Sequence, residues 1–184
     1  IAAVGFDMYC RLVAEEMEKQ LGTGEAVRER EAPQLELGVN AYIPDTYVAD
    51  SELKVEIYKR IAAASPIELE KLKEEIADRY GAPPQVVENL FQIGKLKSMA
   101  MDLDITSIIQ KGQNIVISFH DAHTLSGSSL VRLAEQYGKL ISYKTHKCFA
   151  IHFRIGQSPQ EQRLPLLLGF LGELLAFQQG SGVV

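Results

Sequence analysis

The sequence predicts an α+β protein in which helices pack on a mainly antiparallel sheet, as a single core domain with an N-terminal helix and a linker. Apolar residues recur at helical spacing through most of the first half, whereas strand-like stretches with short connections fill much of the second. The chain has 184 residues, of which 46% are hydrophobic and 23% are charged. This length and composition are typical of a soluble protein with one substantial core.

The start of the chain is expected to lie outside that core. Residues 1–21 predict a terminal helix, because apolar side chains from Phe6 to Leu21 recur at helical spacing with acidic side chains opposite. Residues 22–34 predict a charged linker, since they contain two glycines and one proline and show no sustained period. The α+β domain is therefore predicted to span residues 35–184.

The domain is predicted to begin with a strand. Apolar and polar residues alternate from Leu35 to Ile43, which is the period of a half-buried strand. Pro44 is expected to end this strand, because proline has no N–H to donate to a neighbouring strand.

Three helices are predicted next, each with its own start signal. The signals are Asp50 as an N-cap, Ser65–Pro66–Ile67–Glu68 as a capping box, and Pro83–Pro84 before the third helix. The middle helix is predicted over residues 66–80 and ends at Gly81. The third helix carries a wide apolar surface as far as Met99, which indicates packing against two neighbours.

The second half predicts four more strands and two more helices. The strands are expected over residues 105–110, 115–120, 140–144 and 148–155. The first two form a hairpin around Lys111–Asn114. A helix over residues 130–137 is expected to end at Gly138, and a second capping-box signal at Ser158–Glu161 precedes the final helix.

Composition and motifs exclude several classes of protein. Nineteen Lys and Arg against 24 Asp and Glu give a net charge of −5, which argues against a protein whose main role is to neutralise phosphates. No glycine-rich phosphate loop occurs, so we expect no cofactor and no catalytic activity in this chain. Two cysteines and no long apolar run indicate a cytoplasmic protein with no membrane partner. Because residue 1 is isoleucine, we expect a piece of a longer protein.

One group of residues has the side-chain types that bind metals. It contains His120, Asp121, His123, His146, Cys148 and His152. Its spacing matches no zinc signature, so ordinary turn and surface histidines are the favoured interpretation. A metal-dependent hydrolase remains an alternative, for which bound zinc would be the test.

Basic residues in the later strands suggest another alternative. Lys139, Lys144, Lys147, Arg154 and Arg163 occur there, with the aromatic residues Tyr143 and Phe149 among them. Cationic and aromatic side chains together are typical of a weak nucleic-acid-binding surface. Solvated strand faces whose lysines discourage aggregation are the favoured interpretation.

The helix over residues 66–80 has a charged face opposite its apolar stripe. Glu74 and Asp78 are like charges four residues apart, a repulsion that a pair between Glu75 and Arg79 is expected only roughly to offset. Acidic side chains that do not stabilise their own helix indicate a surface that binds a basic partner.

Five motifs resemble the carboxy-terminal region of the bacterial transcription-repair coupling factor family, also called Mfd. They lie at residues 4–16, 41–48, 57–61, 75–81 and 87–97. Their order and spacing make the resemblance specific over residues 4–103, whereas Pro165 departs from the family pattern. The resemblance implies a domain that follows the motor of an ATP-driven translocase on double-stranded DNA. In that family the parent protein displaces stalled RNA polymerase and recruits UvrA, and its motor uses ATP and Mg²⁺.

The resemblance also implies a role for three residues. The family's acidic positions before the glycine fall on Glu75 and Asp78, with Arg79 adjacent. They would dock on the UvrB-like module of the same parent protein and mask its UvrA-binding surface. This chain would then be an autoinhibitory, regulatory interaction domain.

Overall fold

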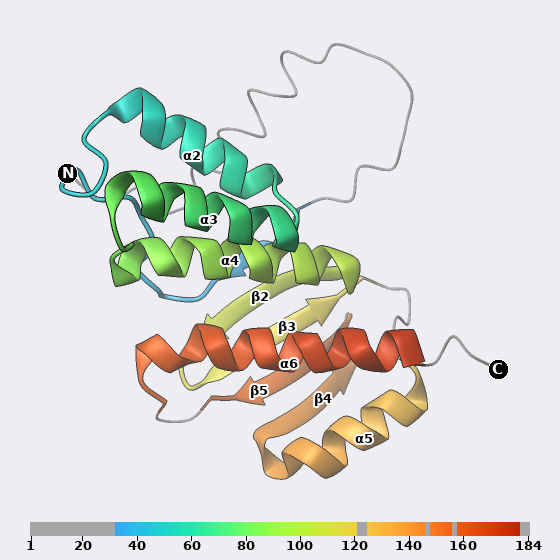
Figure 1. Ribbon diagram of the computed structural model, residues 1–184. Coiled ribbons are helices and arrows are strands. Elements are labelled where there is room, and N and C mark those ends of the chain that lie inside the picture. Colours follow the sequence, from blue (N-terminus) through green and yellow to red (C-terminus); the bar gives the residue numbers. More distant parts are fainter. Residues whose placement is uncertain (1–31, 121–124, 146–147, 156–157, 181–184) are drawn as a thin grey trace, which may run out of the picture. The chain divides into compact units, whose positions relative to one another are not determined.

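The computed structural model describes residues 32–120, 125–145, 148–155 and 158–180 (Figure 1). The described residues form two compact units. Unit 1 contains residues 39–95, and unit 2 contains residues 32–38 together with residues 96–180. Helix α4 (Gln85–Asp102) contributes its first part to unit 1 and its last part to unit 2. The predicted terminal helix over residues 1–21 and most of the predicted linker over residues 22–34 lie outside the described residues.

Unit 1 is built from α2 (Ser51–Ala63), α3 (Pro66–Tyr80) and the first part of α4. The Asp50 carboxylate accepts hydrogen bonds from the N–H groups of Glu52 and Leu53, at 2.8 and 3.1 Å. Ser65 and Glu68 form the predicted capping box, with the Ser65 N–H donating to Glu68 Oε2 at 2.8 Å. The predicted starts of both helices are therefore confirmed.

The core of unit 1 depends on the close approach of α4 to the other two helices. Its buried side chains include Ile57, Ile61, Leu69, Leu72, Ile76, Val87 and Leu90. A Cβ atom at Gly94 would lie 3.0 Å from Ile61 Cγ2 and 3.4 Å from both Leu69 methyl groups. The absence of a side chain at Gly94 therefore lets α4 pack closely against α2 and α3.

The strand predicted from Leu35 to Ile43 is much shorter in the structure. Only β1 (Gln34–Glu36) pairs with a neighbouring strand. Gly38, at φ +59°, turns the backbone out of the strand conformation. The Tyr42 N–H then donates to the Val86 carbonyl at 3.3 Å, and the Ile43 N–H donates to the Tyr58 hydroxyl at 2.8 Å. Alternating burial persists through this segment, but its backbone groups bond to helices instead of a strand.

Unit 2 contains a five-stranded sheet in the order β1-β2-β3-β5-β4. The other strands are β2 (Ile105–Lys111), β3 (Asn114–Phe119), β4 (Ile141–Thr145) and β5 (Phe149–Arg154). Only β1 runs parallel to its neighbour, β2, so the predicted mainly antiparallel sheet is confirmed. The predicted hairpin turns through Gly112 and Gln113, with Gly112 at φ +61°.

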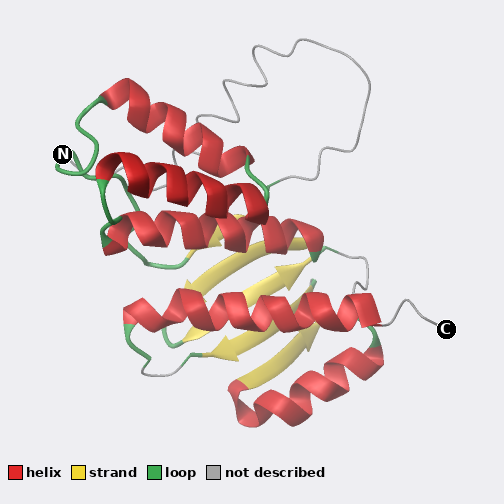
Figure 2. Ribbon diagram, in the orientation of Figure 1, coloured by secondary structure: helices red, strands yellow, loops and turns green. Residues whose placement is uncertain are grey.

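The helices of unit 2 cover one face of this sheet. They are α5 (Gly127–Tyr137), the short 3₁₀ helix η1 (Gly138–Leu140) and α6 (Gln160–Gly180), with the last part of α4. Figure 1 shows α6 lying across the sheet, and Figure 2 shows helices and strands as separate layers in this unit. Phe170 of α6 stacks on Phe153 of β5 at 4.9 Å between ring centroids. Helix α6 continues through Pro165, whose ring is exposed. The predicted α+β class is confirmed.

Candidate functional site

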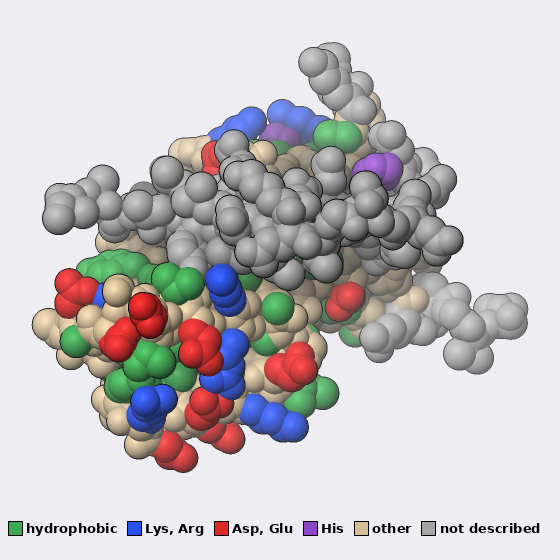
Figure 3. Space-filling model, turned by 90° about the horizontal axis from the view of Figure 1, so that it is seen from above, with side chains coloured by type: hydrophobic (Ala, Val, Ile, Leu, Met, Phe, Trp, Pro, Cys, Tyr) green, Lys and Arg blue, Asp and Glu red, His purple; other side chains and the backbone are tan. Residues whose placement is uncertain are grey.

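Helix α3 presents the charged face that the sequence predicts. Its apolar side chains Leu69, Leu72 and Ile76 are buried in the core of unit 1. Since these residues share one side of the helix, the opposite side points to solvent, and Glu75 and Asp78 are both exposed. Figure 3 shows acidic and basic side chains interspersed on the part of the surface that is drawn in colour. The charged surface is therefore mixed, and its chemistry depends on which charges are already paired.

Glu75 is held by an arginine of the neighbouring helix. Arg60 of α2 donates from Nη1 to Glu75 Oε1 at 2.8 Å and from Nη2 to Oε2 at 2.5 Å. The side chains of Arg60 and Glu75 remain 43% and 56% exposed. The hydrogen bonds and the positive charge of Arg60 lower the pKa of Glu75, and the same hydrogen bonds raise the pKa of Arg60. This is a two-pronged ion pair at the surface.

The predicted favourable interaction of Glu75 with Arg79 is only a weak electrostatic one, because Arg60 is the residue that binds the carboxylate. The Arg79 guanidinium lies over the ring of Tyr80, 5.3 Å from its centroid. Its charge still contributes the smallest of the effects that lower the pKa of Glu75. Arg60, which lies 15 positions earlier on another helix, is the residue that sequence reasoning missed. No helical spacing could reveal it, because the contact depends on how α2 packs beside α3.

Ion pairs join α3 to both neighbouring helices, but they leave out Glu74 and Asp78. Lys73 pairs with Glu88 of α4 at 2.6 Å, and Lys95 of α4 pairs with Glu70 at 3.5 Å. Glu74 and Asp78 make no ion pair or hydrogen bond with other described residues. We call Glu74, Glu75 and Asp78 the α3 acidic face. Among the residues that the structure describes, Glu74 and Asp78 are therefore exposed without a cationic partner, whereas Glu75 is paired with Arg60.

The carboxylates of the α3 acidic face can attract cationic groups of another molecule. The three side chains are all exposed on one helix. Exposed ion pairs are individually weak and weaken further with salt. Several of them together can hold a basic surface while still allowing release, which suits a reversible contact between protein modules.

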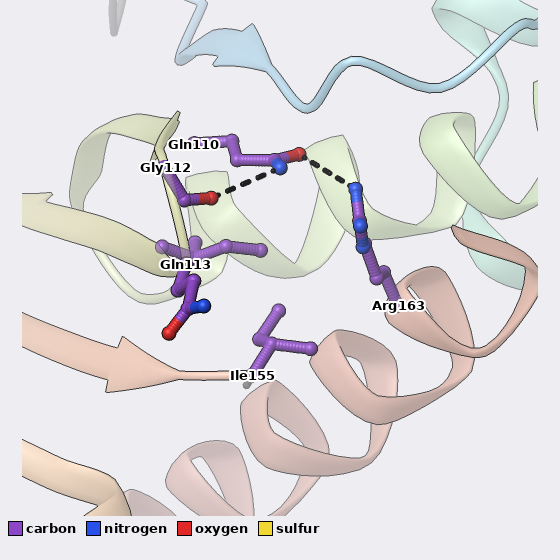
Figure 4. Close-up of a pocket in the computed structure, with 6 residues that line it drawn as sticks. Gln110, Gly112, Gln113, Ile155 and Arg163 are labelled. Carbon is purple, nitrogen blue, oxygen red and sulfur yellow. Dashed lines mark hydrogen bonds between the residues drawn. The ribbon is translucent and has the colours of Figure 1, made fainter. Parts of the chain in front are cut away.

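A small pocket occurs in unit 2, and none of its lining residues belongs to the α3 acidic face. It is lined by Gln110, Gly112, Gln113, Ile115, Ile155 and Arg163. In Figure 4, Arg163 Nη1 donates to Gln110 Oε1 and Gln110 Nε2 donates to the Gly112 carbonyl, both at 3.3 Å. Its free volume is about 10 Å³, whereas small-molecule sites measure roughly 300–1,000 Å³. The pocket has room for about one water molecule.

The possible metal ligands fall partly outside the described residues, since Asp121, His123 and His146 are not among them. His120 is exposed, and its backbone N–H donates to the Asp104 carbonyl at 2.9 Å. His152 is half-buried on β5, where burial and then the charges of two lysines lower its pKa. Within the described part of the chain, no three His, Cys, Asp or Glu side chains come close enough together to hold a metal ion.

The basic and aromatic residues of the later strands lie on opposite faces of the sheet. Lys144 and Arg154 are exposed, whereas Tyr143 and Phe149 stack on each other with ring centroids 6.1 Å apart. The Tyr143 hydroxyl also donates to the Leu130 carbonyl of α5 at 2.7 Å, which fixes it on the helix-covered face. Bases that approach the cationic face could therefore not stack on these aromatic rings. This separation removes the feature that suggested a nucleic-acid surface.

The other basic residues of that group do not restore it. Lys139 is exposed on η1, and Arg163 is occupied in the pocket described above. Lys147 lies outside the described residues. Among the described helices, none is long and apolar enough to cross a membrane.

Comparison with known proteins identifies the family of the chain. A model of the TRCF domain matches residues 37–130. The transcription-repair-coupling factor of Bacillus subtilis is 33% identical over 144 residues, which are 77% of this chain and 12% of that protein. The same factor from Haemophilus influenzae is 30% identical over 181 residues, which are 96% of this chain and 16% of that protein. The chain thus spans less than a fifth of the length of either relative.

A solved structure agrees with these sequence matches. It is described as the C-terminal domain of transcription-repair coupling factor, and it matches with a TM-score of 0.74 and 27% sequence identity. The match covers 81% of this chain and 95% of that one. Because the family model covers half of the chain and the structural match extends beyond it, the chain belongs to the TRCF domain family.

Proposed function

We propose that the chain is the regulatory C-terminal domain of a transcription-repair coupling factor. In this proposal the α3 acidic face docks on the UvrB-like module of the same parent protein and masks the surface that binds UvrA. The observation that carries the proposal is Asp78, an exposed carboxylate without a cation among the described residues, beside an exposed Glu75. Membership of the TRCF domain family supports a transcription-repair coupling factor as the parent protein.

The geometry suits a contact that must open again. The carboxylates are exposed and lie on one helix, so a basic partner can reach them without unfolding any element. Burying a few exposed ion pairs yields a weak, salt-sensitive contact. A change of conformation in the parent could then release the domain, because a modest difference in affinity suffices to shift such an equilibrium.

The activity of the parent protein is part of the same proposal. Its motor would hold ATP and Mg²⁺, move along double-stranded DNA and displace stalled RNA polymerase. This chain would supply no catalytic step and would control access of UvrA. The activity of the parent protein is inferred from the relatives, and the matched residues make up 12% to 16% of the length of those relatives.

The test measures docking in trans by calorimetry, with the whole 184-residue chain and the purified UvrB-like module. Glu75→Ala combined with Asp78→Ala should weaken docking at least about threefold and flatten its salt dependence, because two charges are removed. Glu135→Ala combined with Glu161→Ala is the matched control, since both residues are exposed and lie on α5 and α6. A double variant at 75 and 78 that folds normally and docks with unchanged affinity would refute the proposal.

A further inference from the structure

We propose that Arg60 competes with the docking partner for the Glu75 carboxylate. In the free domain Arg60 binds this carboxylate, and it must be displaced before a cation of the partner can pair with Glu75. This inference rests on the proposed function. It adds a residue on another helix that sets the strength of docking. Without Arg60, the Glu75 carboxylate would lack its hydrogen-bonded cation.

The geometry of the pair supports competition. Arg60 uses both terminal nitrogens, at 2.8 and 2.5 Å, and so engages both oxygens of Glu75. A second cation could not form a similar two-pronged contact while Arg60 stays in place. The free domain therefore presents Asp78 directly and Glu75 only when the pair opens.

The same pair is exposed enough to exchange. Arg60 is 43% exposed and Glu75 is 56% exposed, so water and a partner can reach both ends of it. Exposed ion pairs of this kind open readily, since their net stability is small. Arg60 also lies four residues after Glu56 on α2, and the Glu56 charge contributes to raising the pKa of Arg60. An arginine displaced from Glu75 thus has a second carboxylate nearby.

Removal of Arg60 should leave the fold of unit 1 intact. The inward side of α2 is anchored by Ile57 and Ile61, which are buried in the core. Arg60 itself projects to the surface, where its partner is Glu75. A change in docking on substitution of Arg60 can therefore be separated from a loss of folding.

The test compares Arg60→Gln with Lys59→Gln in the calorimetric docking assay. Lys59 is the adjacent exposed cation on α2, so its substitution removes the same charge without touching Glu75. Arg60→Gln should tighten docking about two- to fivefold, because an exposed pair of this strength keeps Glu75 occupied for most of the time. Lys59→Gln should change docking much less. Arg60→Lys, which cannot form the two-pronged pair, should fall between wild type and Arg60→Gln.

A second background separates this inference from the proposed function. With Glu75→Gln present, Arg60→Gln should no longer tighten docking, because the competitor has lost its target. The competition is refuted if Arg60→Gln weakens docking, matches Lys59→Gln, or has the same effect in the Glu75→Gln background. If neither Glu75→Gln nor Asp78→Asn weakens docking, the proposed function fails instead.

Discussion

Substitution of Gly94 by alanine tests the packing that places α3 beside its neighbours in unit 1. The new Cβ would lie 3.0 Å from Ile61 Cγ2 and 3.4 Å from both methyl groups of Leu69. Replacing glycine by alanine inside a helix normally stabilises it by about 1 kcal/mol. Overpacking a well-filled core destabilises by about 1–3 kcal/mol. Because the two neighbouring side chains belong to different helices, we expect overpacking to win, with a net loss of about 1 kcal/mol.

Gly169→Ala is the matched control for this prediction. Gly169 lies inside α6, and a Cβ there would meet nothing within 4 Å. Only the helical preference of alanine should act at this position, so we expect a gain of about 0.5–1 kcal/mol. The two substitutions should therefore differ in sign.

The assay must follow the two units separately, since Gly94 lies in unit 1 and Gly169 in unit 2. Urea unfolding monitored through backbone amide NMR signals gives a free energy of unfolding for the signals of each unit. A stabilised Gly94→Ala variant, equal in effect to Gly169→Ala, would show that α4 does not approach α2 and α3 as closely as described.

Two other substitutions test local features of the fold. Ser65→Ala removes the N-cap of α3 and should lower the free energy of unfolding of unit 1 by about 1 kcal/mol in the same urea assay. Ser51→Ala, at an exposed serine of α2 in the same unit, should change it less. Tyr137→Phe tests the hydrogen bond that the Tyr137 hydroxyl donates to Glu173 at 2.6 Å. Burial and this hydrogen bond raise the pKa of Tyr137 above its unfolded value, so the stability it contributes is complete below pH ~10 and is lost at higher pH. Wild type should lose stability between about pH 10 and 11 in urea titrations, and Tyr137→Phe should lose less; equal losses would contradict this assignment.

The helix starts could be predicted because their signals are local. Ser65 and Glu68 lie within one turn of each other, and Asp50 caps N–H groups two and three residues away. Such contacts depend on residue types at fixed spacing and hardly on the rest of the fold. The alternation from Leu35 to Ile43 also predicts the burial of Leu37, Ala41 and Ile43, whereas Leu35 and Val39 are half-buried.

The partners of that alternating segment could not be predicted. Whether the Tyr42 N–H pairs with a strand or with the Val86 carbonyl depends on where α4 lies, which is 44 positions further along the chain. Hydrophobic pattern reports burial, and hydrogen-bond partners follow from tertiary packing. The order of the strands in the sheet is non-local in the same way.

In the candidate site, too, local features could be predicted from the sequence and contacts between helices could not. The exposure of Glu75 and Asp78 follows from helical periodicity and could be predicted. The pair between Arg60 and Glu75 could not, because it joins two helices whose contact is fixed by side-chain fit in the core. Arg79, which the sequence places one turn from Glu75, instead lies over Tyr80.

Binding of UvrA by the whole parent protein tests the proposed masking most directly. The measurement compares UvrA affinity of the parent carrying Glu75→Ala and Asp78→Ala with that of the unaltered parent. If the α3 acidic face holds the mask in place, the double variant should bind UvrA several-fold more tightly, because the open state becomes more populated. Unchanged or weaker UvrA binding, in a variant whose docking in trans is reduced, would contradict masking.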